Sequence, residues 1–229
     1  MKRMFGAALG TLSLLMAQPA SPQSDGKTLV FADFEKTENN RPVSARGGLI
    51  QMYAYEESKI HKSTFKGLEG ADPPAPELVR IKKDDPNRAM KFDYSLLAPN
   101  QWAGVTVEIH GLPDADGQAV PEDVSAFRTL SLQVYATGIE ILRLEAVSGE
   151  RGKDMRMQYP QMTFKVRPGF NTYKVPLSGF TQPAWVTERR VDPKEIFRKL
   201  TSINLTAFCE QCEASKQGMV VVDNIVFEK

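Results

Sequence analysis

The sequence is poor in the residues from which most catalytic and metal centres are built. It has two cysteines, two histidines and two tryptophans among 229 residues. The histidines, His61 and His110, lie far from both cysteines, which argues against a zinc site of Cys and His ligands. No GxSxG segment, phosphate-binding loop or HExxH segment occurs. The sequence therefore lacks the motifs of common hydrolases, nucleotide-binding proteins and metalloproteases.

A long apolar run is also absent, apart from a short one at the start. After a basic tripeptide, Met4 to Ala17 carries no charge and small residues follow up to Ala20. This pattern is typical of a secretory signal peptide, and the run is too short to span a bilayer as a helix. We expect cleavage after Ala17 or Ala20, with 1–20 as the signal peptide and 21–229 as one exported domain, periplasmic or secreted. A retained membrane anchor is the alternative.

The chain has no strong excess of charge of either sign. Removing residues 1–20 takes away Lys2 and Arg3 and no acidic residue, so 27 of the 29 basic residues remain against 28 acidic ones, a net charge of −1. A near-neutral protein is not expected to bind nucleic acid or an anionic membrane surface. No segment after the signal peptide is apolar enough to cross a membrane.

The two cysteines stand close together, as Cys209-Glu210-Gln211-Cys212. They follow the strand-like segment Ser202–Phe208 and precede a polar turn. We predict a disulfide between Cys209 and Cys212 that closes the tip of the last hairpin, because an exported protein keeps such bonds. A metal-binding pair and a redox centre are the alternatives.

Short segments with alternating apolar and polar residues recur along the chain, separated by turn residues. The predicted strands are Leu29–Glu35, Gly48–Tyr55, Leu78–Lys82, Ala89–Ser95, Trp102–His110, Phe127–Ala136, Ile139–Val147, Asp154–Tyr159, Gln161–Val166, Asn171–Pro176, Ser202–Phe208 and Met219–Phe227. One helix is predicted over Asp192 to Leu200, with Asp192 as its cap and Pro193 in its first turn. The pattern predicts an all-β fold, an antiparallel jelly-roll β-sandwich with one short helix.

The order of these segments resembles a known family. The matching segments are Phe31–Glu35, Ala89–Ser95, Trp102–Glu108, Phe170–Phe180 and Val222–Ile225. Together they are similar to family 11 carbohydrate-binding modules and the related complex I intermediate-associated protein 30 domain, both galactose-binding-like. The resemblance implies a β-sandwich with a sugar-binding groove on its concave sheet and a structural calcium site at the sheet edge.

Acidic residues mark both the first and the last predicted strand. If these strands are neighbours, Asp33, Glu35 and Asp223 converge near one rim and offer hard oxygen ligands to a structural Ca2+ ion. The family resemblance places Glu35 and Asp223 at the acidic positions of its first and last strands, with Asp33 as a looser match. The alternative is that these acids only discourage pairing at a sheet edge.

Aromatic and planar polar side chains alternate with the apolar residues of several strands. Aromatic rings pack against the apolar faces of sugars, and planar polar groups bind their hydroxyls. The expected ligand-binding residues are Tyr53, Tyr55, Gln133, Tyr135, Arg143, Glu145, Arg156 and Gln158, gathered on one outer face. The alternative is an ordinary solvated face, with Arg143 and Glu145 in a charge network. Trp102 and Trp185 are expected to be half-buried packing residues.

Three pairs of acidic or histidine residues offer catalytic groups, but none comes with the further groups that catalysis needs. Glu108 with His110, and Asp114 with Asp116, lack a nucleophile and a third positioned partner. Glu108 and Glu145 would need a fixed separation across a cleft to hydrolyse a glycoside. We therefore do not expect an enzyme.

The function that fits these features is binding of a carbohydrate or glycan by an exported protein, without catalysis. The alternative is an envelope protein or assembly factor that uses the same face to bind a protein partner. An exposed flat patch with Met155, Met157 and Met162 would favour that alternative.

Overall fold

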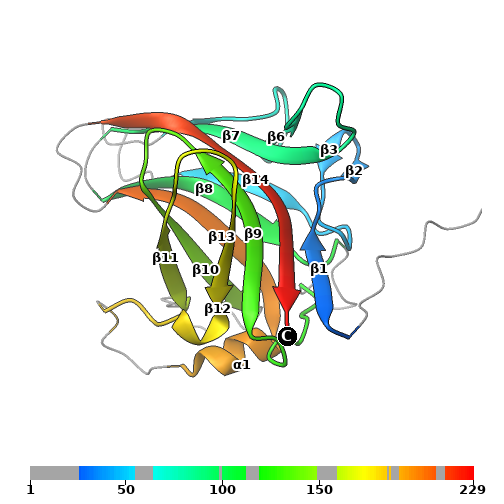
Figure 1. The fold of residues 1–229 in the computed structure, drawn as a ribbon, viewed down its shortest axis with the longest axis vertical. Helices are drawn as coiled ribbons and strands as arrows, with labels where there is room; N and C mark the ends of the chain where they lie inside the picture. Colours follow the sequence, from blue (N-terminus) through cyan, green and yellow to red (C-terminus); the bar gives the residue numbers. More distant parts are fainter. Residues whose placement is uncertain are drawn as a thin grey trace, which may run out of the picture.

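The computed structural model describes residues 26–54, 64–97, 100–111, 119–148, 159–184, 186, 191–209 and 215–229. Two antiparallel sheets pack face to face and a single short α-helix closes one end of the described molecule (Figure 1). The all-β, antiparallel sandwich expected from the alternating segments is confirmed.

The larger sheet has seven strands and contains both ends of the described chain. Its strands are β1 (Thr28–Ala32), β5 (Thr64–Lys66), β6 (Glu77–Arg80), β7 (Arg88–Leu96), β9 (Thr129–Ala136), β12 (Asn171–Pro176) and β14 (Lys216–Glu228). The order along the sheet is β12-β9-β14-β7-β5, while β1 also pairs with β14 and β6 with β7.

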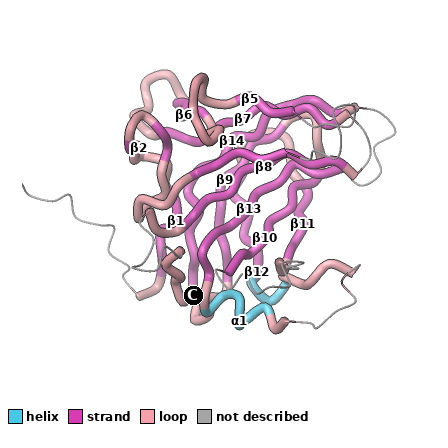
Figure 2. Tube along the Cα trace, turned by 180° about the vertical axis from the view of Figure 1, so that it is seen from behind, coloured by secondary structure: helices cyan, strands magenta, loops and turns pink. Residues whose placement is uncertain are grey.

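The smaller sheet has five strands in the order β11-β10-β13-β8-β4. Its strands are β4 (Ile50–Ala54), β8 (Gln101–Glu108), β10 (Ile141–Ser148), β11 (Gln161–Lys165) and β13 (Leu200–Cys209). Figure 2, seen from behind, shows β8, β13, β10 and β11 side by side. A separate hairpin consists of β2 (Thr37–Glu38) and β3 (Arg41–Pro42).

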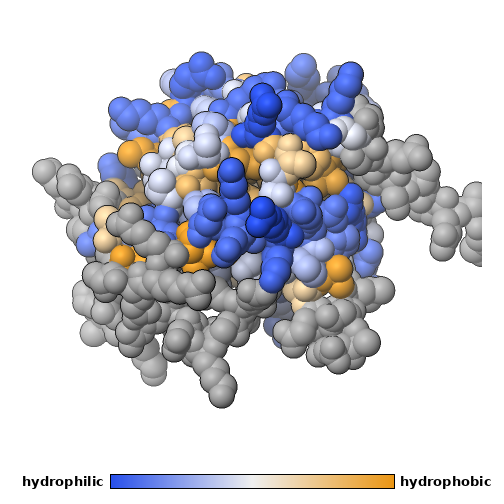
Figure 3. All heavy atoms as spheres, turned by 90° about the horizontal axis from the view of Figure 1, so that it is seen from below, coloured by the Kyte–Doolittle hydropathy of each residue, from blue (hydrophilic) through white to orange (hydrophobic). Residues whose placement is uncertain are grey.

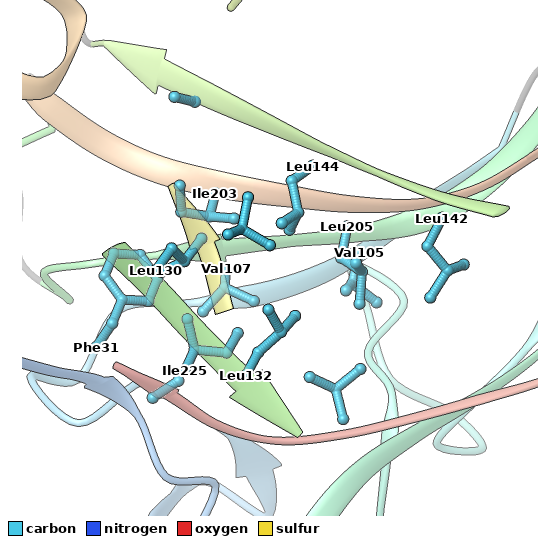
Figure 4. Packing of buried hydrophobic residues seen from close by; sticks show 14 of the residues in the cluster. Phe31, Val105, Val107, Leu130, Leu132, Leu142, Leu144, Ile203, Leu205 and Ile225 are labelled. Carbon is cyan, nitrogen blue, oxygen red and sulfur yellow. The ribbon is translucent and has the colours of Figure 1, made fainter. Parts of the chain in front are cut away.

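The core lies between the two sheets and follows the alternation of the sequence. Leu130 and Leu132 of β9 are fully buried and face Leu142 and Leu144 of β10 across the interior (Figure 4). Burial of one such leucine stabilises the fold by about 2 kcal/mol. The predicted inward residues of these strands are therefore confirmed.

The first and last strands are neighbours, as the sequence analysis required. β1 runs antiparallel to β14, with Leu29 opposite Phe227 and Ala32 opposite Ile225. The rings of Phe31 and Phe227 meet edge to face at 5.8 Å between centroids. This pairing closes the sandwich and brings residues near both ends of the described chain to one rim.

The predicted helix is confirmed, and it is shorter than expected. Helix α1 spans Pro193–Arg198, and the Asp192 carboxylate accepts a hydrogen bond from the Lys194 N–H. Ile196 and Phe197 bury one side of the helix. Among the described residues, none of the helices is long and apolar enough to cross a membrane.

Candidate functional site

The outer face of the five-stranded sheet carries two rows of polar and aromatic residues. In the first row Tyr53, Gly104, Thr206 and Arg143 occupy neighbouring positions on β4, β8, β13 and β10. The next row consists of Gln51, Thr106, Asn204 and Glu145 on the same four strands. Side chains of one row point to the same face because the strands alternate with a period of two.

The second row forms a continuous network across three strands. The Thr106 hydroxyl donates to Asn204 Oδ1 at 2.9 Å, and Asn204 Nδ2 donates to Glu145 Oε2 at 3.0 Å. Glu145 Oε1 lies 2.9 Å from Nε of Arg143 in an ion pair. The Arg143 and Glu145 side chains are only 15% and 16% exposed, so this network is held in a fixed arrangement.

Tyr53 lies across the sheet instead of standing away from it. Its hydroxyl is 2.5 Å from the Thr206 hydroxyl, although β8 separates their strands. Glycine at position 104 leaves room for the Tyr53 side chain to cross β8, because a Cβ there would come within 3.1 Å of the Tyr53 hydroxyl. Burial, and to a lesser degree the Glu145 carboxylate, raises the pKa of Tyr53 above its ordinary value. The phenol therefore stays neutral.

An aromatic row follows at one end of the same face. Trp102 of β8 lies opposite Phe208 of β13, and both are half-buried. The guanidinium carbon of Arg143 lies 4.5 Å from the ring centroid of Phe208, a cation–π contact. Ile141 begins the neighbouring strand and is 39% exposed. We call Tyr53, Trp102, Arg143, Glu145 and Phe208 the aromatic face.

The expectation that all ligand-binding residues share one face is wrong. Gln133 and Tyr135 lie on β9 in the seven-stranded sheet, where Gln133 pairs with Asp223 and Tyr135 with Val221. Tyr53, Arg143 and Glu145 lie on the other sheet. The sandwich core separates these two groups, because each points outward from its own sheet.

The three predicted calcium ligands do lie near one another. Asp223 is fully buried on β14 beside the end of β1. Burial raises the pKa of Asp223, and the nearby carboxylates of Glu35 and Asp33 raise it further. Hydrogen bonds from Asn87 Nδ2 at 2.8 Å and from the Asn224 N–H at 2.7 Å act in the opposite direction.

A cation of the protein already lies at this rim. The Arg88 N–H donates to Glu35 Oε1 at 2.6 Å, and Arg88 Nε lies 3.5 Å from Glu35 Oε2. The Arg88 guanidinium also donates to the Glu35 carbonyl oxygen. Within the described ranges no group of three or more His, Cys, Asp or Glu side chains is arranged to hold a metal ion. Of the three acids, Glu35 pairs with Arg88, and calcium binding at this rim stays a prediction.

Neither a family model nor a curated protein matches this sequence. Solved structures do match. The family 11 carbohydrate-binding module of a cellulosomal cellulase of Clostridium thermocellum aligns with 88% of this chain and 94% of its own, at TM-score 0.55 and 17% identity. The fold is similar to that of family 11 carbohydrate-binding modules.

Two further structures agree with this likeness in fold. The Clostridium thermocellum family 11 module in complex with a β-1,3-1,4-mixed-linked tetrasaccharide covers 88% of this chain and 95% of its own, at TM-score 0.56 and 15% identity. A family 30 module of another cellulosomal cellulase of that organism covers 80% and 92%, at TM-score 0.52 and 8% identity. The resemblance to family 11 modules noted in the sequence thus extends to the whole sandwich.

Several predicted residues cannot be placed on this family 11-like fold. Those outside the described residues are Tyr55, Asp114, Asp116, Met155, Arg156, Met157, Gln158, Trp185, Cys212 and all of 1–20. Cys209 ends β13 at the last hairpin, and the disulfide stays a prediction. Met162 packs against the core, so it does not contribute to an exposed methionine patch.

Among the described residues, Glu145 and His110 of the candidate catalytic pairs are engaged by other side chains, while Asp114 and Asp116 lie outside them. Both carboxylate oxygens of Glu145 already contact Arg143 or Asn204. His110 Nε2 lies 3.1 Å from Glu122 Oε2, which is also bound by Arg46. No local pattern in the sequence indicates this cluster of Arg46, His110 and Glu122, because Arg46 and Glu122 are 76 positions apart and meet only in the folded state.

A cavity at the helical end was also missed. About 640 Å³ of space lies beside α1 and the start of β9, with Phe127, Phe180 and Phe197 in its walls together with Arg128 and Lys194. Figure 3 views the molecule from this end, where hydrophilic side chains surround smaller apolar areas. Phe180 and Phe197 are buried and stack edge to face at 5.4 Å, which assigns them to packing.

Proposed function

We propose that this chain is an exported protein that binds a glycan on its aromatic face without transforming it. The observation that carries this proposal is the combination of aromatic rings and fixed polar groups on one face of the five-stranded sheet. Tyr53, Trp102 and Phe208 supply the rings, and Arg143 with Glu145 supplies planar polar groups. Such faces suit sugars, whose rings have apolar sides and hydroxylated edges.

The likeness in fold supports the proposal. One of the similar structures is described with a mixed-linkage tetrasaccharide, and both families named above are carbohydrate-binding modules. The absence of an assembled acid–base pair among the described residues is consistent with binding alone.

Affinity electrophoresis in gels that contain mixed-linkage β-glucan, xylan or mannan tests the proposal. We expect at least one of these polysaccharides to retard the protein, and Trp102→Ala to reduce the retardation about tenfold or more, since stacking contacts dominate such sites. Trp102→Phe retains a ring and should restore part of the binding. Thr172→Ala on the exposed side of β12, in the other sheet, is the matched control. Unchanged binding by Trp102→Ala would contradict the assignment of the face.

A protein partner on the same face is the second candidate. Ile141, at the end of this face, is 39% exposed, an apolar side chain that a sugar site does not require. If none of the polysaccharides retards the protein, this alternative is favoured. Replacement of Ile141 by Glu should then abolish association with a partner co-purified from the cell envelope, while leaving the thermal melting temperature unchanged.

Export and the disulfide belong to the same proposal, because an oxidising compartment preserves a Cys209–Cys212 bond. The intact mass of protein recovered from the periplasm or medium tests both. We expect the mass of a chain that starts after Ala17 or Ala20 and lacks two hydrogens relative to the reduced chain. A full-length mass, or two thiols that react without a reductant, would contradict export or the bond respectively.

A further inference from the structure

A pocket of about 520 Å³ lies at the upper end of the sandwich, and none of its lining residues belongs to the aromatic face. Its walls are the β9–β10 and β11–β12 connections, which run side by side in Figure 1 and are joined by the hydrogen bond from the Val166 N–H to the Glu140 carbonyl. We call it the rim pocket. Its polar and aromatic lining consists of Tyr135, Thr137, Glu140, Lys165 and Arg167.

One wall of the rim pocket is fixed by a single amide. Asn171 Nδ2 lies 3.3, 3.0 and 2.9 Å from the carbonyl oxygens of Arg167, Pro168 and Gly169, and donates to this turn. The Arg167 N–H donates to the Tyr173 hydroxyl at 2.7 Å. The backbone that carries Arg167 is therefore held in place before any ligand arrives.

The opposite wall is equally well held. The Thr137 carbonyl accepts from the Tyr94 hydroxyl at 2.6 Å, and Thr137 exchanges two hydrogen bonds with the backbone of Met219. Ile139 in this wall also packs against the core. A cleft with two rigid walls loses little conformational entropy on binding, which favours affinity.

The charge of the rim pocket is positive, although the chain as a whole is near neutral. Lys165 and Arg167 are exposed and face one carboxylate of the lining, that of Glu140. Within the part of the chain that the structure describes, neither cation has an ion-pair partner, and Arg167 lies 5.5 Å from the Tyr173 ring. Two cations against one carboxylate, in a cleft with fixed walls, favour an anionic ligand.

Tyr135 adds a half-buried aromatic ring to the same pocket. A ring favours a ligand with an apolar side, and the volume lies in the range of sites for small organic ligands. We propose that the rim pocket binds an acidic sugar residue, one that carries a carboxylate or a sulfate group. The site shares no residue with the aromatic face, although Lys165 pairs with Ile141 at the end of that face, and the proposal does not depend on the function proposed there.

The test uses the intact protein in affinity gels with polygalacturonate for the carboxylate, a sulfated galactan for the sulfate, and mixed-linkage β-glucan as the neutral polymer. We expect at least one acidic polymer to retard the protein. The double variant Lys165→Gln, Arg167→Gln should weaken that retardation about tenfold or more, because charge-assisted hydrogen bonds are lost. The acidic polymer that is bound identifies the anionic group.

A matched control separates a site from general attraction between charges. Lys82→Gln with Lys83→Gln removes the same two charges from an exposed turn elsewhere and should leave binding unchanged. Asn171→Ala keeps every charge and should weaken binding several-fold by loosening the 167–169 turn. Tyr135→Ala should weaken binding, whereas Tyr135→Phe should preserve it. Thermal melts verify that each variant is folded.

Two outcomes would contradict the proposal that the rim pocket binds an acidic sugar residue. One is a folded wild-type protein that neither acidic polymer retards, and the other is an equal loss of binding in the Lys82, Lys83 control. Failure of the neutral glucan alone would leave the rim pocket standing, whereas failure of β-glucan, xylan and mannan together would count against the aromatic face. The two proposals therefore fail separately.

Discussion

Gly104 determines how Tyr53 can lie on its sheet. An added Cβ would come within 2.3 Å of the Leu205 carbonyl oxygen and 3.1 Å of the Tyr53 hydroxyl. Only glycine leaves both the strand pairing and the tyrosine undisturbed. The Tyr53 hydroxyl can then cross β8 and reach Thr206 on β13.

The hydrogen bond between Tyr53 and Thr206 should be measurable as a stability term. Tyr53→Phe and Thr206→Val are each expected to lower the free energy of unfolding by about 1 kcal/mol, because each leaves the other hydroxyl without its partner. Urea unfolding of both single variants and the double variant measures the coupling. The double variant should lose clearly less free energy of unfolding than the sum of the losses in the two single variants.

Thr172→Val is the control for this cycle, because Thr172 is exposed on β12 in the other sheet. When Thr172→Val is combined with Tyr53→Phe, the changes in the free energy of unfolding should be strictly additive. A coupling energy near zero for Tyr53 with Thr206 would contradict the hydrogen bond.

The turn before β9 is expected to make a pH-dependent contribution to the free energy of unfolding. The hydroxyl and the N–H of Ser125 both donate to Asp123 Oδ1, and they lower the pKa of Asp123. A carboxylate whose pKa is lowered in the folded state adds stability above its unfolded pKa of about 4 and loses it as the pH falls through the folded value. Ser125→Ala should therefore cost about 0.5 kcal/mol at pH 7, given the exposure of Asp123, and less at pH 3.

Urea unfolding of wild type and Ser125→Ala at pH 7 and pH 3 measures this change. The difference in the free energy of unfolding between the two proteins should shrink on acidification. If it stays constant or grows, the Ser125 hydroxyl does not act through the Asp123 carboxylate.

At the scale of strands, alternation predicted which side chains point inward and did not predict which strands are neighbours. Phe127–Ala136 and Ile139–Val147 follow each other in the sequence, and consecutive strands often pair. Here β9 and β10 belong to different sheets, because the connection between them crosses from one layer to the other. Tyr135 and Arg143 are therefore separated, although both were correctly expected to point outward.

Asp33, Glu35 and Asp223 lie where β1, β7 and β14 meet, and either Arg88 or a calcium ion could supply the positive charge that they need. Arg88 at the start of β7 binds Glu35 just beyond β1, and its neighbour Asn87 binds Asp223 on β14. If Arg88 supplies the charge, Arg88→Gln should lower the free energy of unfolding by about 1 to 2 kcal/mol, because hydrogen bonds to a charged group are lost. Chelation with EDTA should then leave the melting temperature unchanged.

Thermal melts with EDTA, with added Ca2+ and with neither distinguish the two cations. A melting temperature that falls with EDTA and recovers with Ca2+ would support the calcium prediction. Lys91→Gln in the same strand is the control for loss of a basic residue, since Lys91 contacts Glu77 and Asp93 away from this junction.

At the scale of the whole molecule, the sequence predicted closure of the sandwich better than it predicted the residues of the aromatic face. The closing strands carry alternating apolar patterns, and their pairing buries Leu29 and Phe227 together. The aromatic face instead depends on register, since Phe208 joins Trp102 and Arg143 only when β13 lies between β8 and β10. Pairing across distant segments leaves no local pattern in the sequence.

Binding without catalysis makes a prediction for the intact protein. A glycan oligosaccharide that binds the folded state at 100 times its dissociation constant should stabilise it by about 2.7 kcal/mol and raise the melting temperature. Trp102→Ala should lose this rise, and Thr172→Ala should keep it. The same samples should release no new reducing ends over a day, because both Glu145 oxygens are already engaged by Arg143 and Asn204. A steady increase of reducing ends that Glu145→Gln abolishes would instead identify a hydrolase.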